Sequence, residues 1–100
     1  MASHQSQYRI DTNHPSLPGH FPGNPVVPGV VIIDEILHAL ELWQPESRVQ
    51  GFSSVKFLRP LLPEELFTIE LQTTKAGRVK FECKKDQTLF ATGLISLAPE

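Results

Sequence analysis

Cysteine is almost missing from this sequence. Cys83 is the only cysteine among 100 residues, which excludes an internal disulfide. It also has no cysteine or histidine neighbour at the spacing of zinc ligands. We therefore expect Cys83 to be a small core residue, and we expect no metal site.

Long apolar runs and an excess of positive charge are missing as well. The longest apolar stretch is interrupted by Pro28, Gly29 and Asp34, so it falls short of the roughly 20 residues needed to span a bilayer. Residues 1–10 do not combine a positive start with an apolar segment, as a secretion signal would. The net charge is −2, and there is no basic run or aromatic RNA-binding motif. We expect one cytoplasmic domain over residues 1–100 that neither enters a membrane nor binds nucleic acid.

Proline, in contrast, is abundant, and four of the nine prolines fall between positions 15 and 25. Together with neighbouring glycines they prevent a regular helix or a central strand, so this segment is predicted to be a shaped loop. His20 lies in that loop between Gly19 and Phe21, which restricts its ring and indicates a presented imidazole. Pro28 suits the first position of a helix, where its missing N–H has no partner to lose.

A helix is predicted over residues 30–43. It is apolar nearly all round, and such a helix is normally buried within its domain. Three polar residues, Asp34, His38 and Glu41, interrupt this surface at i, i+4, i+7 spacing. They therefore share one narrow polar face of the helix.

Five strands are expected to accompany the helix. A weak alternation of apolar and polar residues predicts the first strand over residues 8–12, and His4, which precedes it, is given no role. The other strands are expected over residues 49–57, 67–72, 79–84 and 88–97. The strand over 49–57 is expected to be partly covered on both faces. In the last strand one shared face is expected for Leu89, Ala91, Gly93, Ile95 and Leu97. One helix followed by strands with short turns predicts an α+β fold in which an antiparallel sheet packs on the helix.

The segment 19–30, GHFPGNPVVPGV, resembles the active-site loop of the FabA/FabZ-type 3-hydroxyacyl carrier-protein dehydratases. In that family an acidic helical residue follows the loop histidine by fourteen positions, and here that position is Asp34. The likeness continues through residues 56–60, KFLRP, and covers most of the chain. The short chain also resembles the ApeI-like branch. The resemblance implies the hotdog fold, an antiparallel sheet wrapped around a long central helix.

The resemblance implies that a 3-hydroxyacyl thioester is dehydrated to a 2-enoyl thioester, in fatty-acid or polyene-type biosynthesis. This reaction removes a proton from C2 and gives one to the departing C3 hydroxyl. A neutral imidazole is a suitable base near neutral pH, which fits His20, and Asp34 is expected to be the acid. A free aspartic side chain is ionised at neutral pH, so either burial keeps Asp34 protonated or it acts in its charged form through a bound water. Glu35 is an alternative acid one position away.

Three further positions are expected to support this pair. The N–H groups at a helix start can stabilise charge on the thioester oxygen, and Gly29 has no side chain to block close approach. The resemblance implies that Gly29 makes this donation and that the carbonyl of Val26 orients the histidine. His38 stands where the family usually has glutamine, and it could hydrogen-bond Asp34 or perturb its protonation.

Charged residues after the helix have two interpretations. Arg59 and Lys56 could contact the phosphate of a pantetheine arm or an acidic carrier protein, or they could be solvated strand-end charges. Glu64 and Glu65 are interpreted as loop charges.

The resemblance also implies that the histidine of one subunit works with the acid of its mate, in a homodimer or a larger oligomer built from dimers. No cofactor is expected, and the substrate is a thioester of acyl carrier protein or of coenzyme A. Two other functions fit a hotdog protein, namely an acyl thioesterase and a non-catalytic acyl-binding subunit. The sequence leaves open the acyl chain length, the carrier and the pathway.

Overall fold

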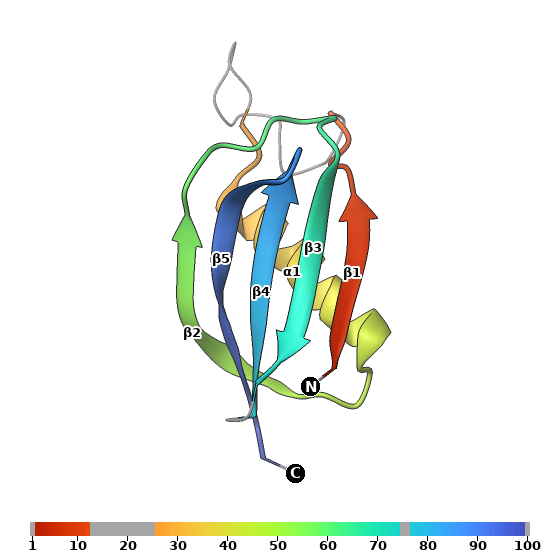
Figure 1. The fold of residues 1–100 in the computed structure, drawn as a ribbon, viewed down its shortest axis with the longest axis vertical. Coiled ribbons are helices and arrows are strands. Elements are labelled where there is room, and N and C mark those ends of the chain that lie inside the picture. Colours follow the sequence, from red (N-terminus) through yellow and green to blue (C-terminus); the bar gives the residue numbers. More distant parts are fainter. Residues whose placement is uncertain (1, 13–25, 75–76, 100) are drawn as a thin grey trace.

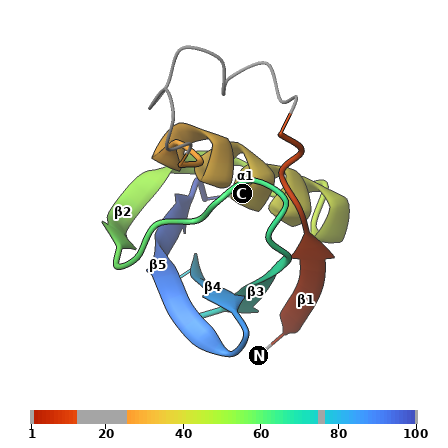
Figure 2. The same cartoon turned by 90° about the horizontal axis from the view of Figure 1, so that it is seen from above.

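The computed structural model of the chain describes residues 2–12, 26–74 and 77–99. Its elements are β1 (Ser3–Tyr8), α1 (Gly29–Trp43), β2 (Val49–Phe57), β3 (Phe67–Thr73), β4 (Arg78–Lys85) and β5 (Thr88–Leu97). The strands form one antiparallel sheet in the order β1-β3-β4-β5-β2, so β1 and β2 are its edges (Figure 1). The sheet curves, and the 15-residue helix α1 lies across its open side (Figure 2). The expected α+β class is confirmed, and the arrangement is that of the hotdog fold.

The core lies between α1 and the concave face of the sheet. In β3 and β4 apolar and polar residues alternate as expected, and every apolar position is at most 1% exposed. These positions are Phe67, Ile69, Leu71, Val79, Phe81 and Cys83. Burial raises the pKa of the Cys83 thiol to about 12, so this thiol stays neutral and inert at physiological pH, as expected for a core residue.

Helix α1 begins at Gly29, and Pro28 is its N-cap rather than its first residue. The carbonyl oxygen of Pro28 accepts a hydrogen bond from the Val31 N–H at 3.0 Å. The helix ends where the Gln44 N–H donates to the Leu40 carbonyl oxygen at 2.7 Å. Both ends of the helix are thus closed by backbone hydrogen bonds, and Pro28 makes no side-chain cap.

Only one face of α1 is buried against the sheet. The buried residues are Val31, Ile32, Ile36, Ala39 and Leu40. On the outer face Val30 and Leu42 are 64% and 67% exposed. The expectation that the helix is buried all round is therefore wrong for the single chain, because the sheet covers one side and nothing among the described residues covers the other.

Strand β5 departs from the expected alternation at Phe90. Its register against β4 shifts there, so Phe90 is an extra residue, a β-bulge. The bulge turns Phe90 into the core, where it is 1% exposed and its ring packs edge-on against that of Phe67, 5.7 Å between centroids. Leu89, expected on the buried face, is only partly buried. Beyond the bulge the expected inward positions Ala91, Gly93 and Ile95 are buried, and Leu97 is only partly buried.

Strand β1 lies earlier in the chain than expected, at Ser3–Tyr8 instead of residues 8–12. His4, which was given no role, stacks on Trp43 at the end of α1, with ring centroids 5.7 Å apart and planes 16° apart. The alternation of apolar and polar residues could not predict this strand, because its residues are mostly polar. Ile10, which suggested the later strand, is buried at 3% exposure after β1 has ended.

Strand β2 has the expected bounds but is more exposed than expected. Only Gly51 and Phe52 are partly buried. Three apolar side chains stay open, since Val49, Val55 and Phe57 are 42%, 36% and 47% exposed. Partial cover of both faces is therefore wrong for the single chain, because β2 is an edge strand.

Candidate active site

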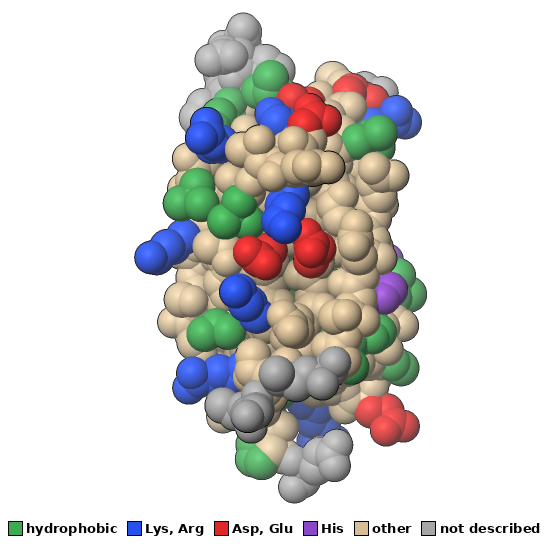
Figure 3. All heavy atoms as spheres, viewed as in Figure 1, with side chains coloured by type: hydrophobic (Ala, Val, Ile, Leu, Met, Phe, Trp, Pro, Cys, Tyr) green, Lys and Arg blue, Asp and Glu red, His purple; other side chains and the backbone are tan. Residues whose placement is uncertain are grey.

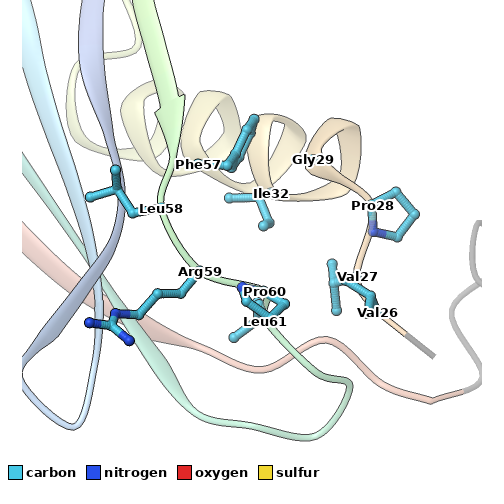
Figure 4. A pocket seen from close by; sticks show the side chains of 10 residues that line it. All are labelled: Val26, Val27, Pro28, Gly29, Ile32, Phe57, Leu58, Arg59, Pro60 and Leu61. Atoms are coloured by element: carbon cyan, nitrogen blue, oxygen red, sulfur yellow. The ribbon is translucent and has the colours of Figure 1, made fainter. Parts of the chain in front are cut away.

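A pocket of about 380 Å³ opens where the start of α1, the end of β2 and the connection after β2 meet (Figure 4). Arg59 is the one charged residue among the ten that line it. The lining residues are Val26, Val27, Pro28, Gly29, Ile32, Phe57, Leu58, Arg59, Pro60 and Leu61. A concave apolar pocket with few polar groups is the usual form of a small-ligand site.

Gly29 stands at the helix start with the ring of Phe57 packed against it. A Cβ atom at position 29 would lie 2.9 Å from Cζ of Phe57, so any larger residue would displace the ring. The first N–H groups of a helix have no intrahelical acceptor, and among the described residues the first with an acceptor is that of Val31. Gly29, which carries one of the donors before it, lines the pocket at the positive end of the helix dipole. This arrangement fits the donor role expected of Gly29, which stays a prediction.

The backbone that leads into the helix is fixed to the wall of the pocket. The N–H of Val27 donates to the carbonyl oxygen of Leu61 at 2.8 Å, and both side chains are buried. Val26, one residue earlier, is partly buried and lines the pocket. Its expected role in orienting the histidine stays a prediction, because His20 lies outside the described residues.

Asp34 is exposed on the outer face of α1. Successive helical residues are about 100° apart, so Asp34 lies about 200° around the helix from Ile32, which lines the pocket. The carboxyl group and the pocket of one chain therefore face in nearly opposite directions. Of the two alternatives left open for Asp34, burial among apolar helix residues is not found in the single chain. Glu35, the alternative acid, is partly buried.

The polar stripe on α1 is confirmed, because Asp34, His38 and Glu41 are all exposed. In the described part of the chain no hydrogen bond or ion pair joins Asp34 to His38. The contact considered for His38 is therefore not made in the single chain. His38 lies one helical turn beyond Asp34 and faces the same side.

The two candidate carrier contacts differ in position. Arg59 lines the pocket, whereas Lys56 alternates with Val55 and Phe57 along β2 and so lies on the outer face of the sheet. Both side chains are exposed. The outer face carries charges of both signs, such as the Lys84–Glu70 pair at 3.1 Å, instead of one positive patch (Figure 3). Any recognition of an acidic carrier on this face is therefore local.

Sequence reasoning missed two residues that line the pocket and one contact in the connection after β2. Phe57 and Leu61 line it, and their position within and next to the family-like segment 56–60 was the signal that could have found them. Glu64 was interpreted as a loop charge, yet its side chain binds Thr12, 52 residues away. No local pattern reports such a contact.

Within residues 2–12, 26–74 and 77–99, no group of three or more histidine, cysteine, aspartate or glutamate side chains could hold a metal ion. No described helix is long and apolar enough to cross a membrane.

Known proteins resemble this chain in sequence. The sequence profile of the ApeI-like family, described as ApeI dehydratase, matches residues 1–94. The 3-hydroxyacyl-[acyl-carrier-protein] dehydratase FabZ of Thermomicrobium roseum is 36% identical over 77 residues, which are 69% of this chain and 52% of that protein. FabZ of Lactobacillus helveticus is 32% identical over 104 residues, with 91% of this chain and 70% of that protein covered.

Solved structures agree with the sequence matches. A chain of the dehydratase heterocomplex ApeI:P from Xenorhabdus doucetiae has a TM-score of 0.86 and 27% identity, with 97% of this chain and 88% of that chain covered. The present chain spans about half the length of the Thermomicrobium roseum protein. Because the family profile matches nearly all of its residues, the chain belongs to the ApeI-like family of dehydratases.

Proposed function

We propose that two copies of this chain together dehydrate 3-hydroxyacyl thioesters of acyl carrier protein to 2-enoyl thioesters, in fatty-acid or polyene-type biosynthesis. The observation that carries the proposal is the apolar pocket at the start of α1, where the backbone donors around Gly29 meet a wall suited to an acyl chain. Membership of a dehydratase family supports the reaction type.

Pairing of two chains is supported by the surface that the single chain leaves open. Strand β2 is a nine-residue edge whose apolar side chains Val49, Val55 and Phe57 are exposed. Long exposed apolar edges are places where another chain adds. Because Phe57 packs on Gly29, the start of α1 lies directly behind this edge. Two copies related by a twofold axis beside β2 bring the outer faces of both helices to the same interface.

The direction in which Asp34 points also favours a site shared by two chains. Asp34 faces away from the pocket of its own chain, so a substrate there can reach only the Asp34 of a partner subunit. At a twofold interface each pocket meets the carboxyl group of the other copy.

The proposed reaction uses the groups in three roles. The His20 imidazole takes the proton from C2, and the electron pair left there forms the C2–C3 double bond while the C3–oxygen bond breaks. The Asp34 carboxyl group of the partner subunit gives its proton to the departing hydroxyl, which leaves as water. The Gly29 N–H holds the thioester carbonyl oxygen, on which negative charge builds. His38, beside Asp34, completes the polar part of the interface.

Arg59 is proposed to bind the phosphate of the pantetheine arm, since it is the charged residue at the pocket and guanidinium groups bind phosphate through paired hydrogen bonds. Lys56 lies on the outer face of β2, where a carrier protein could contact it.

The test measures loss of a 3-hydroxyacyl thioester and formation of the 2-enoyl product by mass spectrometry, with free thiol measured in parallel. His20→Ala and Asp34→Ala are expected to abolish enoyl formation. Glu41→Ala, on the same exposed helix face, is the matched control and keeps activity, and Glu35→Gln separates the two candidate acids. Thiol release without enoyl product would identify a thioesterase instead, and binding without turnover would identify an acyl-binding subunit.

The shared site has its own test. His20→Ala and Asp34→Ala chains are mixed, unfolded and refolded together. Random pairing makes half of the dimers mixed, and each mixed dimer has one intact site of two, so about a quarter of wild-type activity returns. A site within one chain would restore nothing. The relative from Xenorhabdus doucetiae forms a heterocomplex, so a purified chain that remains monomeric would point to an unlike partner here as well.

A further inference from the structure

The connection between β2 and β3 contains a residue in an unusual backbone conformation. Glu64 has a φ angle of 69°, in the left-handed region that residues with side chains rarely adopt. Such a conformation persists only where surrounding contacts hold it, and residues of this kind gather at functional sites. The contacts of Glu64 therefore need an explanation.

Glu64 holds the segment that follows β1. Its Oε2 accepts hydrogen bonds from the Thr12 N–H at 2.6 Å and from the Thr12 hydroxyl at 3.1 Å. Its own N–H donates to the carbonyl oxygen of Ile10 at 2.8 Å, and Arg9 Nε lies 3.5 Å from its Oε1. The backbone and the carboxylate of Glu64 thus contact Arg9, Ile10 and Thr12.

The same connection holds the chain at a second point. The carbonyl oxygen of Leu61, a pocket residue, accepts the N–H of Val27 at 2.8 Å. In the sequence Thr12 and Val27 stand before and after His20. One connection therefore ties the pocket wall to fixed backbone points on both sides of the proposed base.

Fold stability gives little reason for Glu64 to be here. The Arg9 and Glu64 side chains are 58% and 45% exposed, and exposed ion pairs contribute little to stability. Glycine would adopt the same φ angle without strain. What glycine lacks is the carboxylate that binds Thr12.

We propose that Glu64 is a positioning residue of the dehydratase: its carboxylate fixes the backbone of Thr12, the last described residue before His20 in the sequence, relative to the connection that forms the pocket wall. The inference rests on the proposed function. Glu64 acts through Thr12 and contacts neither the substrate nor the reacting atoms.

Two substitutions separate this role from a merely structural one. Glu64→Gly removes the carboxylate and relieves the backbone, so the melting temperature stays equal or rises. The kcat for enoyl formation falls on the order of tenfold to a hundredfold, while KM changes much less, because misplaced groups slow the chemical step. Glu64→Gln keeps an acceptor oxygen for Thr12 and restores most of the kcat.

Glu65 provides the matched control. This neighbouring glutamate binds Lys85, with Nζ at 2.9 Å and 3.1 Å from its two carboxylate oxygens, and the hydrogen bond from Lys85 lowers its pKa. Glu65→Gln breaks an ion pair of the same connection without touching Thr12. Its kcat is expected to equal that of the wild type.

An unchanged kcat in Glu64→Gly overturns the proposal, and so does a fall in kcat that only matches a loss of folded protein. A wild-type chain without enoyl formation defeats the proposed function instead. In that case the hydrogen bond between the Glu64 carboxylate and Thr12 is tested independently of activity, by hydrogen exchange of the Thr12 amide in NMR spectra. Faster exchange in Glu64→Gly than in Glu65→Gln supports the hold, and equal exchange in both overturns it.

Discussion

The two edges of the sheet have opposite characters. Strand β1 has six residues, SHQSQY, whose exposed positions are polar and whose partly buried positions point inward. Strand β2 has nine residues, and its apolar side chains Val49, Val55 and Phe57 are exposed. The outer face of α1 also carries exposed apolar residues. Val30 and Leu42 lie near the two ends of its polar stripe.

This difference is the reason for proposing that β2, and not β1, is the edge that pairs with a second chain. A polar edge exposes its backbone groups to solvent at little risk, whereas an apolar edge of nine residues is stable in solution only when another chain covers it. The pocket opens at the β2 edge. At the β1 edge the ring of His4 stacks on that of Trp43, which is the last residue of α1. The pocket thus lies at one edge of the sheet and the His4–Trp43 stack at the other.

The largest effect is expected from a charge introduced on the β2 edge, where two copies are proposed to pair. Val55→Glu places a carboxylate on the face of β2 that Phe57 shares, where two copies are proposed to meet. Burying an unpaired charge is costly, so the dimer is expected to dissociate and activity to fall at least about a hundredfold. Analytical ultracentrifugation measures the first effect and the enoyl assay the second.

The control for this change is Ser54→Glu, the adjacent residue on the outer face of the sheet. It introduces the same side chain in the same strand and is expected to leave the dimer intact. If Val55→Glu remained dimeric and active, β2 would not be the pairing edge.

A smaller effect is expected at the other edge when the stack is removed. Trp43→Ala deletes a partly buried ring that packs against the core and stacks on His4. The expected loss is about 2 kcal/mol in the free energy of unfolding, below that of a fully buried tryptophan. Urea denaturation measures it, and His4→Ala in the same background should then cost nothing further. Dimerisation and kcat stay unchanged, and a parallel loss of activity would contradict the division between the edges.

The same contrast explains which elements could be predicted from the sequence. Strands β3 and β4 were predictable because both lie in the interior of the sheet, where one face meets the core and apolar residues must alternate. Strand β1 was misplaced because an edge strand with polar residues carries no such signal. The bulge at Phe90 was also invisible, since one extra residue changes the register without changing the composition of β5.

The site divides along a similar line. Gly29 and Val26 were expected at the site because their segment carries a family-like motif, and both line the pocket, whereas their roles stay predictions. The surroundings of Asp34 could not be predicted, because its exposure depends on which helix face the sheet covers. Glu64 lies in a connection as expected, but its contact with Thr12 could not be predicted, because it joins residues 52 positions apart. Local pattern thus identifies chemical groups, and tertiary contacts decide what surrounds them.

The smallest expected effect completes the comparison. Gln7→Glu puts on the β1 edge the side chain that Val55→Glu puts on the β2 edge, at a position that is exposed and pairs with Thr68. The substitution changes shape little and buries no charge, so the free energy of unfolding should move by no more than about 0.5 kcal/mol. Sedimentation and kcat should match the wild type. Dissociation of the dimer by this variant would show that both edges contact partners, because a charge can disrupt an assembly only at a surface from which assembly removes water.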